Sequence, residues 1–314
     1  MIIHRIYPGR EKEGNMKFSM CTAVFGMHDL HDTIRRAAEI GFDAVEITAA
    51  KHLPIESTKE RRAEVKGWLD EAGITCSGLH YIWDGSVKLA TKDKEQNEKA
   101  CEYLCKVIDV AADLDAKTVI VGSGGATRHL DDEADREEAA KCVAEVLRRA
   151  GDYAQTKDVY LAVEAINRYE TNFLNTMQEA TEFVEMVNHP HVRTMADTYH
   201  INIEETDPAG SIRKYGYALQ NLHLADSNRC APGTGHIDFD AIAAALLESG
   251  FDKYCSFEVF GLYPWKLWFD SADEAERQMR IGLQTAKAAF ARAEYNAQYG
   301  PIDNKFGETS YEGR

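Results

Sequence analysis

A single-domain (β/α)8 barrel of the α/β class is the fold that the sequence predicts. Short β-rich runs alternate with longer helical runs eight times along the 314 residues. No linker or low-complexity stretch separates the eight units. Acidic or imidazole side chains end the last four predicted strands, and strand ends are where such barrels carry their active sites. An open, doubly wound sheet is the alternative fold.

The first half of the chain supplies four units. Apolar residues in its helical segments recur at helical spacing, as Val143, Val146 and Leu147 do. Gly41 and Gly73 are expected to end the first two helices, because glycine readily adopts the left-handed conformation found at helix ends. The strands are predicted over Phe18–Cys21, Ala44–Ile47, Ile74–Leu79 and Thr118–Val121. The helices are predicted over Leu30–Ile40, Thr58–Ala72, Lys92–Leu114 and Glu133–Lys157.

The second half supplies the other four units and closes the predicted TIM barrel. Its strands are predicted over Tyr160–Glu164, Val192–Asp197, Leu222–Ala225 and Cys255–Glu258. Its helices are predicted over Thr176–Val187, Asp207–Lys214, Phe239–Ser249 and Ser271–Ala293. Residues 16–294 are therefore assigned to the barrel, residues 1–15 to an N-terminal extension and residues 295–314 to a polar C-terminal tail.

Composition limits the classes of partner. The net charge of −16 disfavours nucleic acid and anionic membranes, and no apolar run is long enough to span a bilayer. The N-terminus lacks the apolar centre of a secretory signal peptide, so we expect a cytoplasmic protein. The seven cysteines contain no C-x-x-C pair, which predicts buried free thiols and no zinc site.

Four strand ends carry the residues most suited to chemistry. They are Glu164, Asp197, His223 and Glu258, which a closed barrel would bring to one place. Three carboxylates and one imidazole suit a single divalent metal such as Mn²⁺, Co²⁺ or Mg²⁺. For any one of these residues, a helix cap or a salt-bridge partner is the alternative interpretation.

The motifs around these strand ends resemble a known family. They are Val163-Glu164-x-x-Asn167-Arg168-x-Glu170, Asp197-Thr198-x-His200-x-Asn202, His223-x-x-x-x-Asn228-Arg229-x-x-Pro232-Gly233-x-Gly235, and Glu258. This part of the chain is similar to the sugar isomerase/epimerase superfamily of xylose-isomerase-like barrels, and within it to the D-tagatose 3-epimerase and D-allulose (psicose) 3-epimerase group. Between residues 17 and 159 the resemblance is limited to the barrel pattern.

The resemblance implies a function and a set of roles. It implies that Glu164, Asp197, His223 and Glu258 bind one divalent metal, with Mn²⁺ favoured. It also implies that both glutamates exchange protons with the substrate, and that Glu170, His200 and Arg229 contact substrate oxygens. The expected enzyme is a ketose 3-epimerase that works through a metal-stabilised cis-enediolate. A small-molecule sugar is the expected partner, and the protein is expected to be a homo-oligomer, either a dimer or a tetramer.

Several individual residues have competing interpretations. Glu170 either contacts substrate or orients Arg168 through a salt bridge. Asp226 is either a partner of His223 or a helix cap, and His236 is expected to be a loop residue rather than a metal ligand.

Three segments depart from the epimerase pattern and leave the substrate open: the one over residues 23–28 after the first strand, and two others with competing interpretations. Glycines at 122, 124 and 125 form either a tight turn or a phosphate-binding turn. The aromatic run over residues 260–269 forms either a sugar-binding wall or part of a core or subunit interface.

The same residues are compatible with other reactions. The alternatives are an aldose–ketose isomerase similar to hydroxypyruvate isomerase, or a lyase that acts on a keto-sugar, a keto-inositol or a 3-keto-glycoside. A DNA-repair endonuclease would require more histidines and a basic surface, and a sugar-binding protein without activity would not require both glutamates.

Overall fold

The strands of this protein close into one parallel barrel in the order β1 to β8, and β1 pairs with β8 to complete the ring. The computed structural model describes residues 16–26, 28–122, 125–261, 269 and 271–300. The predicted closed barrel is confirmed, and the pairing of β1 with β8 excludes an open sheet. The strands are β1 Lys17–Cys21, β2 Ala44–Thr48, β3 Thr75–His80, β4 Thr118–Val121, β5 Tyr160–Glu164, β6 Val192–Asp197, β7 Leu219–Leu224 and β8 Tyr254–Phe257.

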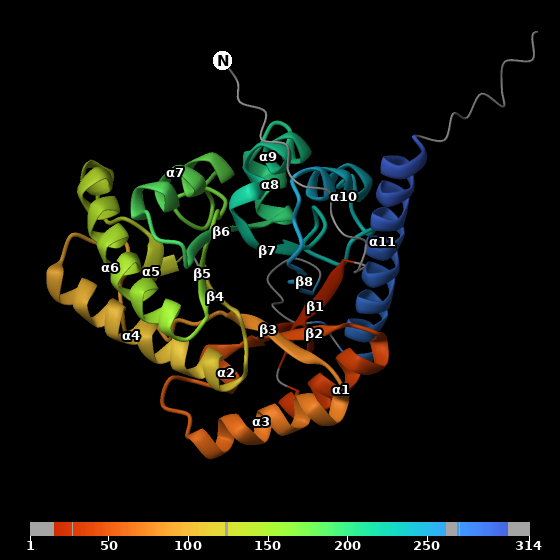
Figure 1. Ribbon diagram of the computed structural model, residues 1–314, viewed down its shortest axis with the longest axis horizontal. Coiled ribbons are helices and arrows are strands. Elements are labelled where there is room, and N and C mark those ends of the chain that lie inside the picture. The colour runs from red at the N-terminus through yellow and green to blue at the C-terminus, as the bar shows by residue number, and fades with distance from the viewer. Residues whose placement is uncertain (1–15, 27, 123–124, 262–268, 270, 301–314) are drawn as a thin grey trace, which may run out of the picture.

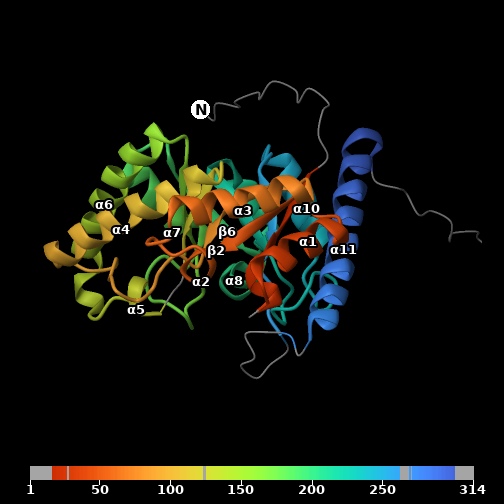
Figure 2. The ribbon, with the colours of Figure 1, turned by 90° about the horizontal axis from the view of Figure 1, so that it is seen from below.

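Long helices surround the strands on the outside (Figure 1), and the view turned by 90° shows α11 along one flank (Figure 2). These helices are α1 Leu30–Ile40, α3 Lys59–Ala72, α4 Lys94–Asp113, α6 Arg136–Thr156, α7 Met177–Val187, α9 Pro208–Tyr215, α10 Phe239–Glu248 and α11 Ala272–Tyr299. Shorter turns lie in the loops: η1 Thr22–Phe25, α2 Ala49–His52, α5 Gly125–Arg128, η2 Glu133–Asp135, α8 Thr198–Glu204 and η3 Gly216–Ala218. Each helix in the described ranges is too short or too polar to cross a bilayer.

Local sequence signals account for the helix ends. Asp29 and Asp93 accept hydrogen bonds from backbone N–H groups in the first turns of α1 and α4. Gly41 and Gly73 end α1 and α3 in the left-handed conformation, with φ of 103° and 68°, as predicted.

The element boundaries differ from the predicted ones where polar residues lie in strands or on exposed helix faces. β7 begins at Leu219 rather than Leu222, because the polar residues Gln220 and Asn221 are buried in the strand. β3 extends to His80, and β8 ends one residue before Glu258. α11 continues to Tyr299, so residues 295–299 are helical rather than tail. The predicted extension over residues 1–15 and the tail beyond Gly300 lie outside the described residues.

The barrel interior has an apolar side and a polar side. Ile120, Ala162 and Met195 form a small core cluster from β4 to β6, separate from the larger apolar core of the protein. Polar groups from β1, β3, β7 and β8 hydrogen-bond to one another instead: Ser19 lies 2.6 Å from Ser77, and Ser256 donates to Asn221 at 3.3 Å. Branched apolar residues normally fill such an interior, so the polar side indicates a function beyond packing.

Candidate metal and proton-transfer site

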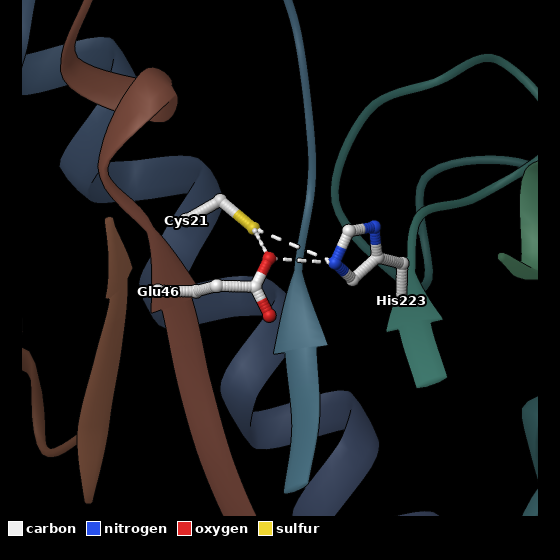
Figure 3. Close-up of side chains that lie close together, drawn as sticks. All are labelled: Cys21, Glu46 and His223. Carbon is white, nitrogen blue, oxygen red and sulfur yellow. Dashed lines mark hydrogen bonds and ion pairs between the residues drawn. The ribbon is translucent and has the colours of Figure 1, made fainter. Parts of the chain in front are cut away.

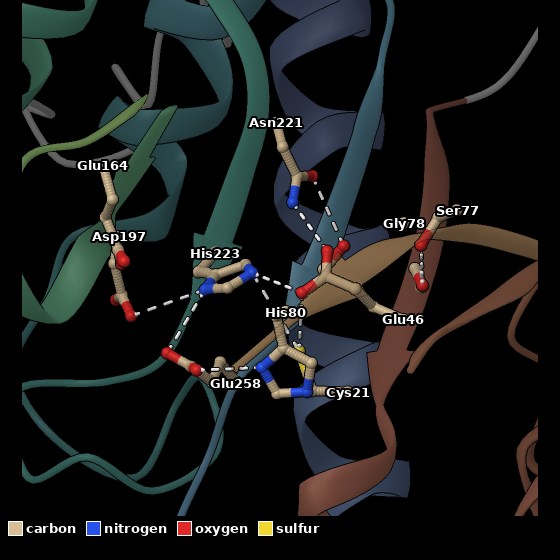
Figure 4. Close-up of polar contacts among 12 residues, drawn as sticks. Cys21, Glu46, Ser77, Gly78, His80, Glu164, Asp197, Asn221, His223 and Glu258 are labelled. Atoms are coloured by element: carbon tan, nitrogen blue, oxygen red, sulfur yellow. Dashed lines mark hydrogen bonds and ion pairs between the residues drawn. The ribbon is translucent and has the colours of Figure 1, made fainter. Parts of the chain in front are cut away.

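The four predicted metal ligands meet at the C-terminal end of the barrel. Glu164 ends β5, Asp197 ends β6, His223 lies in β7, and Glu258 follows β8. Each contributes one ligand atom, and these atoms all lie within 4.8 Å of one another. Figure 4 shows the four side chains converging on one point from neighbouring strands. Parallel strands in register produce this arrangement, since Asp197 pairs directly with His223.

Burial and mutual repulsion change the proton affinities of two carboxylates in this cluster. Glu164 is 5% exposed, and its burial together with the charge of Glu258 raises its pKa to about 8. Asp197 is fully buried, and burial raises its pKa to about 6 even though Arg229 lies beside it. These two groups therefore hold protons more tightly than ordinary carboxyl groups do.

Glu258 behaves in the opposite way. Burial opposes its ionisation, but His223 and Arg229 outweigh that effect and hold the Glu258 pKa well below its usual range. Burial likewise disfavours the charged form of His223, but Glu46 and Glu258 raise the His223 pKa well above its usual value. Two neighbouring carboxyl groups with separated proton affinities are the arrangement that acid–base catalysis requires.

Arg229 lies directly on this cluster. Its guanidinium group contacts the carboxylate of Asp197 and donates to Glu258 at 2.5 Å. It also lies between two aromatic rings, 4.8 Å from the centre of Tyr199 and 5.0 Å from that of Phe260. Arg229 is therefore held by two of the predicted metal ligands, a placement that the motif alone did not indicate.

His200 and Glu170 are linked through one amide. The side-chain nitrogen of Asn167 donates to His200 Nδ1 at 2.7 Å and to Glu170 at 3.0 Å. Because Nδ1 accepts, the proton of the neutral ring is on Nε2, which lies 3.8 Å from Glu164. Burial, together with the charge of Arg229, keeps the His200 pKa well below its usual value.

The alternative role of Glu170, as the partner of Arg168, is wrong. Arg168 pairs with Glu204, with an N–O distance of 2.6 Å. Glu170 stays half exposed beside His200.

The structure adds three buried polar residues that the sequence analysis missed. Glu46 hydrogen-bonds to His223 at 2.7 Å, and His80 hydrogen-bonds to Glu258 at 3.3 Å. Arg128 donates to three backbone carbonyls, including that of Glu164 at 2.8 Å. The sequence did contain a sign of the role of Glu46, because it is the acidic residue inside the otherwise largely apolar strand Ala44–Thr48. His80 lay one residue beyond its predicted strand.

Gly122 provides space for Glu164. A Cβ atom at this position would lie 2.0 Å from Glu164 Oε2, so only glycine allows the carboxylate its present place. The backbone carbonyl of Gly122 also accepts a hydrogen bond from Trp83 Nε1 at 3.1 Å. Gly122 is thus explained by the approach of a site carboxylate, while positions 123 and 124 of the same turn lie outside the described residues.

Asp226 has neither of its two predicted roles. Its carboxylate accepts hydrogen bonds from the backbone N–H groups of Ser227, Gly233 and Ile237, at 2.7, 2.8 and 3.1 Å. It organises the loop between β7 and α10. His236 is an exposed loop residue that contacts Ser227, as predicted.

The remaining predictions concern the cysteines and the aromatic run. All seven cysteines are free; Cys105 and Cys142 are only partly buried, whereas the others are buried as expected. Of the aromatic run over residues 260–269, positions 262–268 lie outside the described residues, and Phe260 flanks Arg229.

The chain is similar to known enzymes over most of its length. The chain is 30% identical over 303 residues to the D-psicose 3-epimerase of Enterocloster bolteae, covering 90% of this chain and 98% of that enzyme. It is 31% identical over 274 residues to the D-psicose 3-epimerase of Ruminiclostridium cellulolyticum, covering 82% of this chain and 90% of the other.

The fold agrees as well. The crystal structure of D-psicose 3-epimerase with D-tagatose from Clostridium cellulolyticum H10 superimposes with a TM-score of 0.79 at 26% identity, covering 88% of this chain and 99% of that one. The family described as "Xylose isomerase-like TIM barrel" matches residues 34–287. The protein therefore belongs to the xylose isomerase-like TIM barrel family.

Proposed function

We propose that this protein is a metal-dependent ketose 3-epimerase. The observation that carries the proposal is the pair Glu164 and Glu258, which share one four-residue cluster with Asp197 and His223, with ligand atoms within 4.8 Å of one another. The similarity to D-psicose 3-epimerases supports a ketose as the substrate class.

The charges around the cluster suit one divalent cation. Four buried or nearly buried carboxylates, those of Glu46, Glu164, Asp197 and Glu258, face the two buried or largely buried guanidinium groups of Arg128 and Arg229. The carboxyl groups outnumber the guanidinium groups, and one divalent ion bound among them would favour their ionised forms. Glu164, Asp197, His223 and Glu258 would hold it, and oxygen-rich ligand sets of this kind suit Mn²⁺, with Co²⁺ or Mg²⁺ as alternatives.

The reaction requires a proton to leave one face of a carbon and another to arrive on the opposite face. A bound divalent ion would stabilise negative charge on the neighbouring carbonyl and hydroxyl oxygens. Glu164 ends β5 and Glu258 follows β8, so one carboxylate could accept the proton while the other supplies one, with the roles reversed in the opposite direction.

The surrounding residues would position the sugar. The Nε2–H of His200 points toward the Glu164 side of the cluster and can donate to a sugar oxygen. Arg229 carries a permanent charge on the other side and can hold a second oxygen, as Glu170 can from the exposed rim. An aldose–ketose isomerase or a lyase would start from the same proton removal, so the product distinguishes these reactions.

Proton exchange in D2O, followed by NMR, tests this proposal. Mn²⁺-loaded protein would be incubated with tagatose, fructose, allulose, xylulose and ribulose, and the metal exchanged to Mg²⁺ before spectra are recorded. Deuterium at C3 together with a new C3 epimer is the expected result. Loss of water or of an aglycone would instead identify a lyase. No exchange with any ketose, in protein shown to hold metal, would contradict the proposal.

A further inference from the structure

We infer that Glu46 is a positioning residue that fixes the ring of His223 for metal binding. The inference rests on the proposed function, because it concerns the same metal site. Glu46 comes from β2 and lies on the opposite side of the His223 ring from Asp197 and Glu258 (Figure 4).

The two ring nitrogens of His223 face different partners. Nδ1 lies 3.2 Å from Glu258 and 4.0 Å from Asp197, on the side where the cluster converges. Nε2 lies 2.7 Å from Glu46 Oε1 on the other side (Figure 3). A metal shared with these carboxylates would bind Nδ1, so Nε2 would carry the proton and donate it in a hydrogen bond to Glu46.

Glu46 is itself held in place by a chain of hydrogen bonds through Asn221 and Ser256. Asn221 Nδ2 donates to Glu46 Oε2 at 2.7 Å, and Asn221 Oδ1 accepts a hydrogen bond from Ser256 at 3.3 Å. Asn221 and His223 are two residues apart in β7 and therefore face the same side of the strand. One strand thus provides both the predicted metal ligand and the residue that anchors its partner.

A charged group in this position requires a functional reason. Both Glu46 and His223 have side chains that are 1% exposed, and burying a carboxylate is costly unless it is paired. Within the part of the chain that the structure describes, Glu46 contacts His223, Asn221 and the thiol of Cys21. The imidazole is therefore the partner that compensates its charge. A carboxylate behind a metal-binding histidine fixes the ring orientation and makes the ring a stronger ligand.

The thiol of Cys21 raises a competing arrangement. Its sulfur lies 3.3 Å from Glu46 and 4.0 Å from His223 Nε2, and these three ligand atoms also lie within 4.8 Å of one another. A second metal there would require Nε2 to lose its proton and Glu46 to change partners. We therefore assign the position to a hydrogen bond, and the number of ions bound per chain distinguishes the two arrangements.

The test compares Mn²⁺ binding by the wild-type chain and three variants, with free Mn²⁺ followed by EPR. Glu46→Gln keeps the size of the side chain but removes its charge, and the expected result is 10–100-fold weaker binding of a single ion. Ser77→Ala is the matched control, because Ser77 is buried in the same interior and pairs with Ser19; wild-type affinity is expected. Cys21→Ser should also bind one ion.

The outcomes separate the inference from the proposed function. If the wild-type protein binds no Mn²⁺, the proposed metal site itself is contradicted. Binding by Glu46→Gln at wild-type affinity would overturn the role of Glu46 alone. Two ions in the wild type and one in Cys21→Ser would overturn it in favour of a second metal.

A second measurement uses the wild-type protein, so its result does not depend on whether a variant folds. ¹⁵N NMR of the Mg²⁺-loaded wild type should show the His223 proton on Nε2, and a proton on Nδ1 would contradict the inference.

Discussion

Glu164 and Glu258 show how one cluster gives two identical side chains different properties. Glu164 lies against Gly122 and above Arg128, whose guanidinium binds the carbonyl of Glu164 rather than its carboxylate. Glu258 receives hydrogen bonds from His80, His223 and Arg229. Direct cationic and imidazole partners stabilise the ionised form of Glu258, whereas burial without such partners favours the protonated form of Glu164.

Glu164→Gln and Glu258→Gln should each abolish turnover while leaving the fold intact. An amide cannot exchange the proton, so a loss on the order of 10²–10⁴-fold is expected from each change. Deuterium incorporation measures the activity, and circular dichroism checks the fold. If either variant kept full activity, the glutamate that it replaces would not take part in proton transfer.

Gly122→Ala should reduce activity by moving the Glu164 carboxylate. The added Cβ would overlap Oε2, so the carboxylate must leave its present position. A loss on the order of 10²-fold is expected in the deuterium assay, as for a misplaced catalytic group.

Gly67→Ala in α3 is the control for this change. A Cβ there has no neighbour within 4 Å, so activity should be unchanged and the melting temperature equal or higher. Full activity in Gly122→Ala would show that the site tolerates a displaced Glu164.

At the scale of elements, the loop between β7 and α10 depends on one carboxylate. Burial alone would raise the Asp226 pKa, but four backbone N–H groups, from Ser227, Gly233, Gly235 and Ile237, outweigh burial and lower it. This loop carries Arg229, whose left-handed φ of 64° is maintained by the surrounding turn. The Asp226 carboxylate thus supports Arg229 through the loop, and the backbone carbonyl of Asp226 accepts a hydrogen bond from the backbone N–H of Arg229 at 2.8 Å.

Asp226→Asn should destabilise the protein in a pH-dependent way. The folded pKa is below the unfolded one, so the stabilisation is present above about pH 3.9 and is lost as pH falls through the folded value. A cost of about 1–3 kcal/mol near neutral pH is expected, because the amide leaves N–H donors unsatisfied. Melting temperatures from about pH 7 to about pH 3 should show the two proteins converging. Asp252→Asn, at an exposed surface position, should show no such trend.

At the scale of the whole molecule, the barrel concentrates negative charge where its strands end. A metal that binds the folded chain would stabilise it, because the ligands come from β5, β6, β7 and the segment after β8 and meet only in the closed ring. The predicted homo-oligomer and cytoplasmic location remain predictions.

Chelation of the metal should lower the melting temperature and abolish activity. Mn²⁺ at about 100 times its Kd adds about 2.7 kcal/mol, which corresponds to about 4–5 °C for a domain of this size. Calorimetry with and without EDTA measures the shift, and Asp197→Asn, which alters a ligand, should show a smaller one. Unchanged activity in verified metal-free protein would contradict the metal dependence.

Local patterns in the chain were enough to predict the barrel, the order of its elements, the family and the epimerase class. Hydrophobic periodicity and helix caps are local signals, and the strand-end motifs lie within a few residues of one another. Such signals predicted the placement of Glu164, Asp197, His223 and Glu258, which the structure brings together.

The groups that support this cluster could not be predicted from local patterns, because they come from distant parts of the chain. Glu46 and His223 are 177 positions apart, and Gly122 reaches Glu164 across neighbouring strands. The Asp226 carboxylate accepts hydrogen bonds from backbone N–H groups instead of taking either predicted role, and Arg168 pairs with Glu204 instead of Glu170. These partners are set by register, strand tilt and closure of the ring, which act between distant segments and leave no periodic trace in the chain.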